Sequence, residues 1–280
     1  MRLADAGELG LLAELERRGL AQRIEHDAAQ LAGGVVVTQD ALVEDVHFRL
    51  AWTSWRDLGY KAAAVNLSDL AASGAEPEGL IVSLGLPGET DLDRVVELYE
   101  GLNEPGVAVL GGDTTAADRV YLSVTAVGRS GRVPGRAGAR PGDLLVVTGP
   151  LGGSAVGFAA LRDGRESPHI AAHLRPPIRL QEGRRLARVA HAMLDISDGL
   201  AIDAAHIAER SRCRLVIELE RVPLAAGVGE LGFGEDYELL AATPDPLEFP
   251  VIGRCEAGSG VVLTLNGEPV ELGGWEHFRD

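Results

Sequence analysis

The sequence predicts an α/β protein with two domains, each a mixed sheet with helices packed on it. Strand-like apolar runs, such as residues 35–38 and 80–86, alternate with segments of helical periodicity. A chain of 280 residues suits about two domains on the usual scale of roughly 150 residues each. Residues 128–142 read GRSGRVPGRAGARPG, dense in turn-forming residues, so we expect domains at 1–130 and 131–280.

In the first domain, the patterns predict three helices and four strands. A helix capped by Asp5 ends at Gly19, because Glu8 follows the cap by three residues and apolar residues recur at helical spacing. Two further helices are expected at 61–74 and from about 91 to 102. The apolar runs predict strands at 35–38, 80–86, 107–110 and 121–127.

The second domain is expected to open with a strand at 143–148, a glycine-rich turn and a helix through Leu161. The turn glycines at 149–153 can cradle an anion, although tight strand-to-helix turns need glycine in any case. A helix is expected at 178–192, and Ser197 or Asp198 is placed to cap another. Further strands are expected at 215–219, 239–242, 251–252 and 261–265.

The segment KAAAVNLSDLAASG, residues 61–74, is the centre of this interpretation. On a helix, Asn66, Asp69 and Ser73 form one polar stripe among alanines, which let other backbone approach closely. A carboxylate on such a helix needs partners. We therefore expect Asp69 to face a cluster of polar groups; the alternative is a core helix with a solvated polar edge.

Other acids follow strand-like runs, where ligands collect in α/β folds. Asp40 and Asp113 each close such a run, and Asp195 and Asp198 follow residues 192–194. Two unit charges about 5 Å apart repel by roughly 3 kcal/mol at an effective dielectric of about 20. Converging carboxylates therefore need cations, and a carboxylate-only set favours Mg²⁺ or a similar hard ion.

The composition excludes several classes of function. The chain has 42 acidic and 26 basic residues, a formal charge of −16, which argues against nucleic acid or an anionic membrane as partner. Lys61 is its only lysine. Two isolated cysteines, Cys213 and Cys255, suit a reducing cytosol, and no signal peptide or membrane-spanning run is recognisable, so we expect a cytoplasmic protein.

Several nucleotide-binding and hydrolytic signatures are absent. Lys61 lacks the preceding glycines of a Walker P-loop. The protein-kinase motifs and the GxSxG elbow of hydrolases are missing as well. An enzyme that uses a nucleotide here must hold its phosphates mainly through carboxylate-bound metal.

Six motifs together resemble thiamine-monophosphate kinase, a family of the aminoimidazole-ribonucleotide-synthetase-like superfamily. The resemblance implies ATP-dependent phosphorylation of thiamine monophosphate to thiamine diphosphate, a two-domain fold of that superfamily, a homodimer formed through the first domain's sheet, and an active site between the domains. The motifs follow the family's order across nearly the whole chain: DALVEDVHF (40–48), 61–74, GGDTT (111–115), RAGARPGD (136–143), DISDGL (195–200) and GEDYEL (234–239).

The resemblance also implies roles for individual residues. Three of these residues also have simpler interpretations that involve no ligand: His47 as a structural residue, Arg136 as a solvated linker residue and Trp275 as a core aromatic. No general base is expected, because the acceptor is itself a phosphate, and transfer is expected to be direct and in line. The implied ligands of several Mg²⁺ ions are Asp27, Asp40, Asp69, Asp113, Asp195 and Asp198; the nucleotide contacts are Gly112, Arg136 and Ser197; the thiamine-phosphate contacts are His47, Glu235 and Trp275.

Three positions depart from the family pattern. Glu25-His26 stands where the family has Gly-Asp, Gln39 where it commonly has a hydroxyl residue, and Phe233 where it has glycine. Imidazole is a poor ligand for a hard ion, so we expect an altered metal requirement that tolerates Mn²⁺. The alternatives are a non-catalytic nucleotide-binding relative and another ATP-dependent synthetase of the superfamily. Selenophosphate synthetase is disfavoured because no cysteine precedes Cys213.

Overall fold

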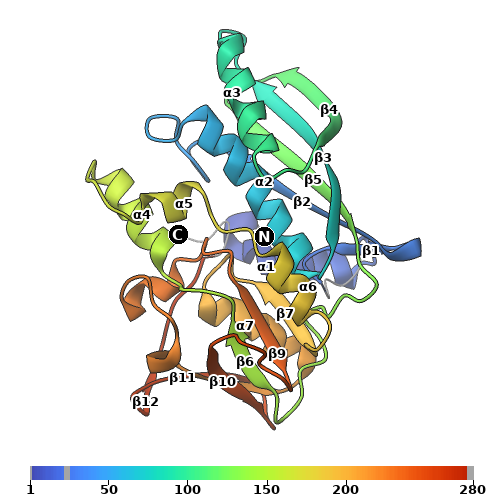
Figure 1. Cartoon of the computed structure of the whole chain (residues 1–280), viewed down its shortest axis with the longest axis vertical. Helices are drawn as coiled ribbons and strands as arrows, with labels where there is room; N and C mark the ends of the chain where they lie inside the picture. The colour runs from blue at the N-terminus through green and yellow to red at the C-terminus, as the bar shows by residue number, and fades with distance from the viewer. Residues whose placement is uncertain (1, 22–25, 276–280) are drawn as a thin grey trace.

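The chain folds into two mixed sheets with helices packed between and around them. The computed structural model describes residues 2–21 and 26–275, and Figure 1 shows the two sheets one above the other with helix α2 (Trp55–Ala72) between them. The helices, three short 3₁₀ turns and twelve strands of these described residues confirm the predicted α/β class.

Among the described residues, the first sheet has five strands, and β3 and β4 are its only parallel pair. Its strand order places β2 and β4 three positions apart, with β5 and β3 between them. Strand β2 pairs with β5 along its whole length, with Asp40 opposite Val124. The strands, in spatial order, are β1 (Ala29–Leu31), β2 (Val35–Val43), β5 (Tyr121–Arg129), β3 (Glu76–Leu86) and β4 (Val109–Ala116).

Helices α2 and α3 (Leu92–Asn103) cover one face of this sheet. Strands β2 and β5 alternate buried and more exposed residues, as expected for a sheet packed on one side. Ser54 caps α2 by accepting the N–H of Asp57. The two helices pack closely, because a side chain at Gly59 would lie only 1.9 Å from the carbonyl oxygen of Leu98.

Within residues 26–275, the second sheet has seven strands, of which only β8 and β11 pair in parallel. Its central strands β6 and β9 are almost wholly buried. The strands, in spatial order, are β12 (Glu268–Val270), β11 (Gly260–Leu265), β8 (Arg214–Glu218), β10 (Val251–Glu256), β6 (Leu144–Val147), β9 (Leu239–Thr243) and β7 (Ala192–Asp195). The remaining helices are α1 (Leu3–Arg17), α4 (Gly153–Arg162), α5 (Ile170–Leu174), α6 (Leu180–Leu186) and α7 (Leu200–Ser211), and the 3₁₀ turns are η1 (Ala32–Gly34), η2 (Leu219–Arg221) and η3 (Val228–Gly232).

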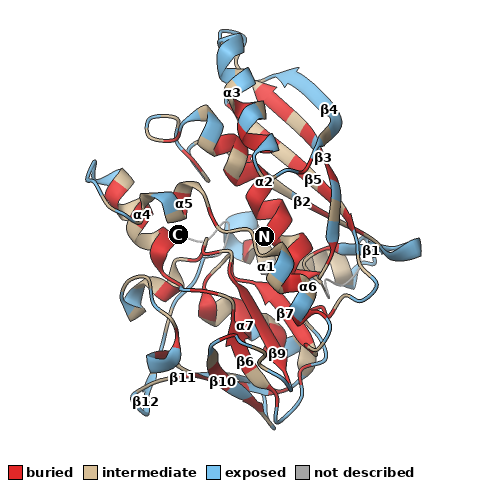
Figure 2. Cartoon of the chain, in the orientation of Figure 1, coloured by how far each residue is buried: buried red, intermediate tan, exposed pale blue. Residues whose placement is uncertain are grey.

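Helix α2 joins the two halves of the molecule. Figure 2 shows it buried along most of its length. It packs on α3, β2 and β5 of the first half and on α6 and β7 of the second. Ala71 and Ala72 at its end share a hydrophobic cluster with Met193 of β7 and Leu239 of β9. Side chains on different faces of α2 therefore point toward different sheets.

Several predicted elements differ from those observed. Helix α2 begins at Trp55, two turns before the predicted start, and Asp40 and Asp113 lie within β2 and β4 rather than after them. The predicted helix at 178–192 is the short α6, after which the chain turns into β7. The N-cap of α1 is Arg2, and Asp5 lies in the first turn instead.

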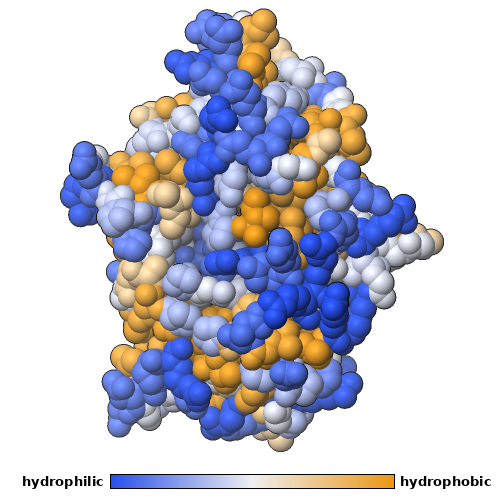
Figure 3. All heavy atoms as spheres, viewed as in Figure 1, coloured by the Kyte–Doolittle hydropathy of each residue, from blue (hydrophilic) through white to orange (hydrophobic). Residues whose placement is uncertain are grey.

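The surface mixes hydrophilic and hydrophobic residues. Figure 3 shows broad hydrophilic areas on one face, with apolar residues gathered in several separate patches. Within residues 2–21 and 26–275, no helix combines the length and the apolar character needed to cross a bilayer.

Candidate active site

Four aspartates from both halves of the chain meet beside α2; Asp195 is buried and the other three are half-buried. Asp27 precedes β1, Asp40 lies on β2, Asp69 on α2, and Asp195 at the end of β7. Burial raises the pKa of Asp69 well above its usual range, and the charges of Asp40, Asp195 and Asp27 raise it further. We call these four residues the acid cluster. The sequence predicted all four as metal ligands, and the structure brings them together.

Each member of the acid cluster except Asp40 receives a side-chain hydrogen bond. Thr38 of β2 donates to Asp69, and Ser68 of α2 donates to Asp195. Arg136 donates through Nε to Asp27 Oδ1 at 2.8 Å. Adjacent positions on α2 thus face opposite sheets: Asp69 faces the first sheet, and Ser68 holds a residue of the second.

The acid cluster carries more negative charge than its neighbours offset. Burial raises the pKa of Asp40 to about 6, with help from Asp198 and Asp27, and raises that of Asp195 to about 8. Arg136 opposes the same effect at Asp27. The oxygen-only donor set and the raised pKa values fit hard divalent cations, which stabilise the ionised carboxylates.

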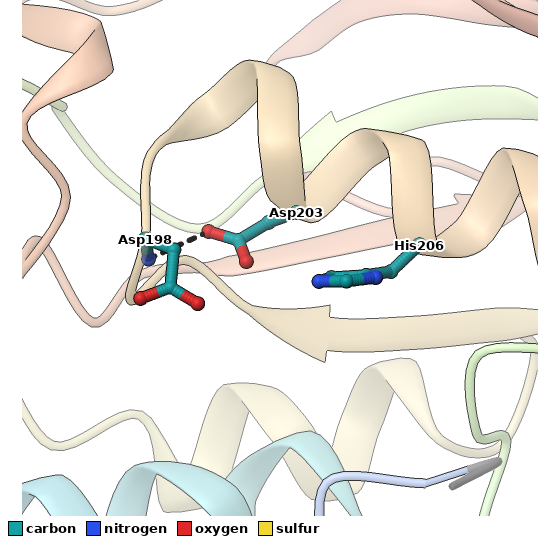
Figure 4. A group of neighbouring side chains, drawn as sticks. All are labelled: Asp198, Asp203 and His206. Carbon is teal, nitrogen blue, oxygen red and sulfur yellow. Dashed lines mark hydrogen bonds between the residues drawn. The ribbon is translucent and has the colours of Figure 1, made fainter. Parts of the chain in front are cut away.

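A second group of possible ligands lies where β7 leads into α7 (Figure 4). One ligand atom from each of Asp198, Asp203 and His206 lies within 4.8 Å of the other two, close enough for a shared cation. Asp203 Oδ2 accepts the backbone N–H groups of Ser197, Asp198 and Gly199 at 3.0 to 3.1 Å. The predicted cap by Ser197 or Asp198 is therefore wrong: Gly199 is the N-cap, and Asp203 satisfies the turn.

The only lysine of the chain forms a buried ionic group two helical turns before the acid cluster. Lys61 of α2 is 2% exposed, and its Nζ lies 3.1 Å from Glu235 Oε2. His173 Nδ1 lies 3.1 Å from the same oxygen and 3.0 Å from Ser154 Oγ. Burial alone raises the pKa of Glu235, but Lys61 and His173 outweigh it and lower the pKa to about 2. We call Lys61, Glu235 and His173 the lysine triad.

The glycine-rich turn before α4 does not present an open anion cradle. Asp236 accepts the backbone N–H of Gly152 at 2.8 Å and that of Ser154 at 3.5 Å. Its carboxylate thus occupies the N-terminus of α4, where a phosphate would otherwise bind. Of the two interpretations that the sequence left open, the turn geometry explains these glycines better.

Gly112 and Asp113 lie apart from the acid cluster within one chain. Both are exposed on the edge strand β4. Three strand spacings separate β4 from β2, or about 14 Å between backbones. Gly112 has φ of 154°, and a side chain there would meet the carbonyl oxygen of Val82, so the position requires glycine for packing. Their assigned roles stay predictions.

The remaining predicted contacts lie at two places. The backbone N–H of Trp275 donates to the carbonyl of Asp198, and that of Glu235 to the carbonyl of Ser197, at 2.9 and 2.8 Å. Both residues thus border the turn between β7 and α7. His47 lies beyond β2, where its Nδ1 accepts the N–H of Val43 at 3.0 Å. That bond gives His47 a structural role, whatever it contacts in addition.

Sequence reasoning missed the residues that complete these groups. Thr38, Ser68 and Asp203 have ordinary polar side chains whose partners are distant or follow a turn, so nothing local marks them. Lys61 carried a usable signal, because a single lysine inside an alanine-rich helix is expected to be buried and therefore paired. Its neighbour His173, 112 residues further along, carried no such signal, and Glu235 was predicted only as a substrate contact and not as the partner of Lys61.

Comparison with known proteins identifies the family. Residues 25–130 match the family described as AIR synthase related protein, N-terminal domain, and residues 140–268 match its C-terminal domain. The chain belongs to this family of AIR synthase related proteins. Within it, the chain belongs with the thiamine-monophosphate kinases, as the following relatives show.

Thiamine-monophosphate kinase of Aquifex aeolicus is 34% identical, with 99% of this chain and 100% of the relative covered. The enzyme of Mycobacterium tuberculosis is 37% identical over 91% of this chain and 85% of the relative. A solved structure of AaThiL complexed with AMPPCP and TMP superposes with a TM-score of 0.92 at 34% identity, covering 99% of both chains.

Proposed function

We propose that this protein transfers the γ-phosphate of ATP to thiamine monophosphate, giving thiamine diphosphate. The acid cluster carries the proposal, because four carboxylates with raised pKa values need the cations that phosphoryl transfer uses. The relatives are named thiamine-monophosphate kinase, and one was solved with an ATP analogue and TMP. The spacing of motifs over the whole chain supports the same assignment.

In this proposal the chain acts mainly by positioning two phosphates. Asp27, Asp40, Asp69, Asp195 and Asp198 would hold Mg²⁺, which offsets the charge that develops on the transferred phosphoryl group. The residues around them fix the carboxylates: Thr38 orients Asp69, Ser68 orients Asp195, and Asp203 orients the turn that carries Asp198. No general base is required, because the acceptor oxygen belongs to a phosphate.

The substrate contacts remain proposals with different support. Glu235 and Trp275 border the turn at residues 197–198, and Ser197 lies in that turn, so these three suit contacts to either substrate. Arg136 is paired with Asp27 and can contact a nucleotide phosphate only beside that carboxylate. Gly112, Asp113 and His47 lie further away within one chain.

We further propose a cytoplasmic homodimer formed through the first sheet. The face of that sheet opposite α2 and α3 carries exposed apolar side chains, Ile81 at 43% and Leu110 at 64% exposure. Strand β4 is an exposed edge, which natural proteins usually cover or pair. A second copy placed there would also bring another Asp113 to the interface.

The first test is direct: purified protein is incubated with ATP, Mg²⁺ and thiamine monophosphate, and thiamine diphosphate is followed by chromatography. Product that disappears with Asp69→Ala supports the kinase. No product with Mg²⁺ or Mn²⁺ despite measurable ATP binding would favour a non-catalytic nucleotide-binding relative. A phosphorylated protein residue that turns over at a competent rate would refute direct transfer.

A further inference from the structure

The buried ammonium of Lys61 has more hydrogen-bond donors than the protein uses. An ammonium carries three N–H donors. Among the residues that the structure describes, Glu235 is the single hydrogen-bond partner of Lys61, and the lysine side chain is 2% exposed. A buried charge is costly unless its hydrogen bonds are completed. Two donors of this ammonium are therefore not used by any residue that the structure describes.

Glu235 likewise has an oxygen to spare and an unusual backbone. Lys61 and His173 both contact Oε2, and no described residue hydrogen-bonds to Oε1. The glutamate side chain is 22% exposed, so this carboxylate forms the accessible edge of the lysine triad. Its φ of 55° is left-handed, a conformation that costs energy for a non-glycine residue and that gathers at functional sites.

The surroundings of the lysine triad suit an aromatic ligand. His173 lies 5.3 Å from Phe158 and 6.3 Å from Phe233, measured between ring centroids, and the two phenylalanines lie 5.2 Å apart. Such rings can hold a cationic heterocycle through their π faces. Phe233, which stands where the family has glycine, thus belongs to this group of rings.

The lysine triad lies within reach of the acid cluster. Lys61 and Ser68 are seven residues apart, so they share one face of α2 and are separated by a rise of about 10.5 Å. Ser68 holds Asp195, and Glu235 hydrogen-bonds to the carbonyl of Ser197 two residues further on. A phosphate bound by Lys61 would therefore lie beside the face that carries the acid cluster.

We propose that Lys61 binds the phosphate of thiamine monophosphate while Glu235 faces its cationic thiazolium ring, an inference that rests on the proposed function. The lysine triad offers one cation and one anion side by side, and the acceptor carries one anionic group and one cationic ring. In the free protein Glu235 neutralises Lys61. With substrate bound, the phosphate takes the free donors of Lys61 and lies within reach of the acid cluster.

The test compares two ligands that differ only in the phosphate. Binding of thiamine monophosphate and of thiamine is measured by calorimetry, without nucleotide or metal, for the wild type, Lys61→Met and Glu235→Gln. The wild type is expected to prefer thiamine monophosphate by tenfold or more. Lys61→Met is expected to lose that preference while it keeps its affinity for thiamine. Glu235→Gln is expected to weaken the binding of both ligands and to keep the ratio of their affinities.

Controls separate binding from folding. Arg94→Met removes an exposed cation of α3 and should leave both affinities unchanged. Circular dichroism checks that each variant is folded. If Lys61→Met does not fold, the double variant Lys61→Met/Glu235→Gln replaces it, because that variant leaves no unpaired charge. The double variant must then show no preference for the ligand with the phosphate. Lys61→Arg keeps the charge and should restore part of the preference.

Two outcomes would overturn the inference in different ways. If Lys61→Met keeps the full preference while the wild type still makes thiamine diphosphate, the phosphate is bound elsewhere and the kinase assignment stands. If the wild type binds neither ligand and forms no product, both proposals fall together. Retained preference in Arg94→Met with loss in Lys61→Met supports the assignment of Lys61.

Discussion

The acid cluster and the lysine triad both lie beside α2, yet carboxylic acids behave oppositely in them. Burial raises the pKa of Asp69, and its carboxylate neighbours raise it further. Burial also raises the pKa of Glu235, but Lys61 and His173 lower it to about 2. The lysine triad balances its own charge, whereas the carboxylates of the acid cluster repel one another. Burial alone therefore does not decide whether the pKa of a carboxylate is raised or lowered; the charges of its neighbours do.

The largest expected effect comes from removing one charge of the acid cluster. Asp69→Asn keeps the shape of the side chain and removes its charge, so kcat/KM should fall by about a thousandfold or more, since the metal-held phosphates lose one ligand. Without metal, the same variant should unfold at an equal or higher temperature, because repulsion with Asp40 and Asp195 is relieved. Steady-state kinetics and thermal unfolding in EDTA measure the two effects.

Asp93→Asn is the matched control, because Asp93 is exposed in the first turn of α3. It should change neither activity nor stability appreciably. A metal-free Asp69→Asn protein that is clearly less stable than the wild type would contradict the view that the acid cluster is self-repelling.

In the lysine triad, removing the charge of an acid is expected to lower the stability of the protein. Glu235→Gln leaves Lys61 buried without its partner, and breaking a buried pair costs about 3 to 5 kcal/mol. Urea unfolding should therefore show a large loss of stability in the absence of any ligand. Adding Lys61→Met should recover most of it, because the double variant holds no unpaired charge. Equal stability of Glu235→Gln and wild type would show that Lys61 is not energetically dependent on Glu235.

The pH dependence should follow the acid cluster in metal-free protein. The folded pKa values of Asp40 and Asp195, about 6 and about 8, exceed the ordinary value of 3.8. Their protonated forms therefore favour folding below about pH 4, and this contribution is lost as the pH rises through 6 and 8. The free energy of unfolding in EDTA should fall by several kcal/mol across that range.

The contribution of Glu235 to stability has the opposite pH dependence, because its pKa in the folded protein, about 2, lies below the ordinary 4.5. Its contribution is present above pH 4.5 and is lost only as the pH falls through 2. Mg²⁺ should remove most of the loss seen at high pH. A metal-free protein whose stability rises steadily from pH 5 to 8 would argue against raised pKa values in the acid cluster.

The smallest expected effect concerns His26, beside the acid cluster. Its Nδ1 is buried and has no hydrogen-bond partner among the described residues, while Nε2 lies 3.1 Å from the side-chain nitrogen of Gln30. His26→Asp would supply a carboxylate next to Asp27 and should tighten Mg²⁺ binding by up to about tenfold, lowering the activity with Mn²⁺ relative to Mg²⁺. Metal titrations of turnover measure both. Unchanged affinity and rate would leave the altered metal requirement without support; Glu25, the other departure, lies outside the described residues.

The sequence predicted the fold class and three members of the acid cluster, Asp40, Asp69 and Asp195, from local patterns, whereas Asp27 was assigned through the family resemblance alone. Apolar periodicity marked most strands, and acids beside strand-like runs marked Asp40 and Asp195. It failed where tertiary contacts decide. The polar first turns of α2 carry no apolar stripe, and the helix predicted up to residue 192 ends at Leu186, before the chain enters the strand-like run that forms β7.

The lysine triad and Asp113 show the same limit at the level of the site. Ion pairs between residues more than a hundred positions apart follow from the packing of α2 against the second half of the chain, which no spacing rule supplies. Asp113 looked equivalent to Asp40 because both close apolar runs. Strand order, which the sequence does not state, puts them three strands apart.

The ligands of the acid cluster come from both sheets, so a bound cation ties together two parts of the chain that each have their own hydrophobic core. Asp27, Asp40 and Asp69 belong to one side and Asp195 to the other. If the proposed cations bind there, they would couple the unfolding of one half to that of the other. Chelation would then weaken that coupling, and the halves would stay joined by the alanine-rich contacts of α2 and by ion pairs such as Lys61–Glu235 and Arg136–Asp27.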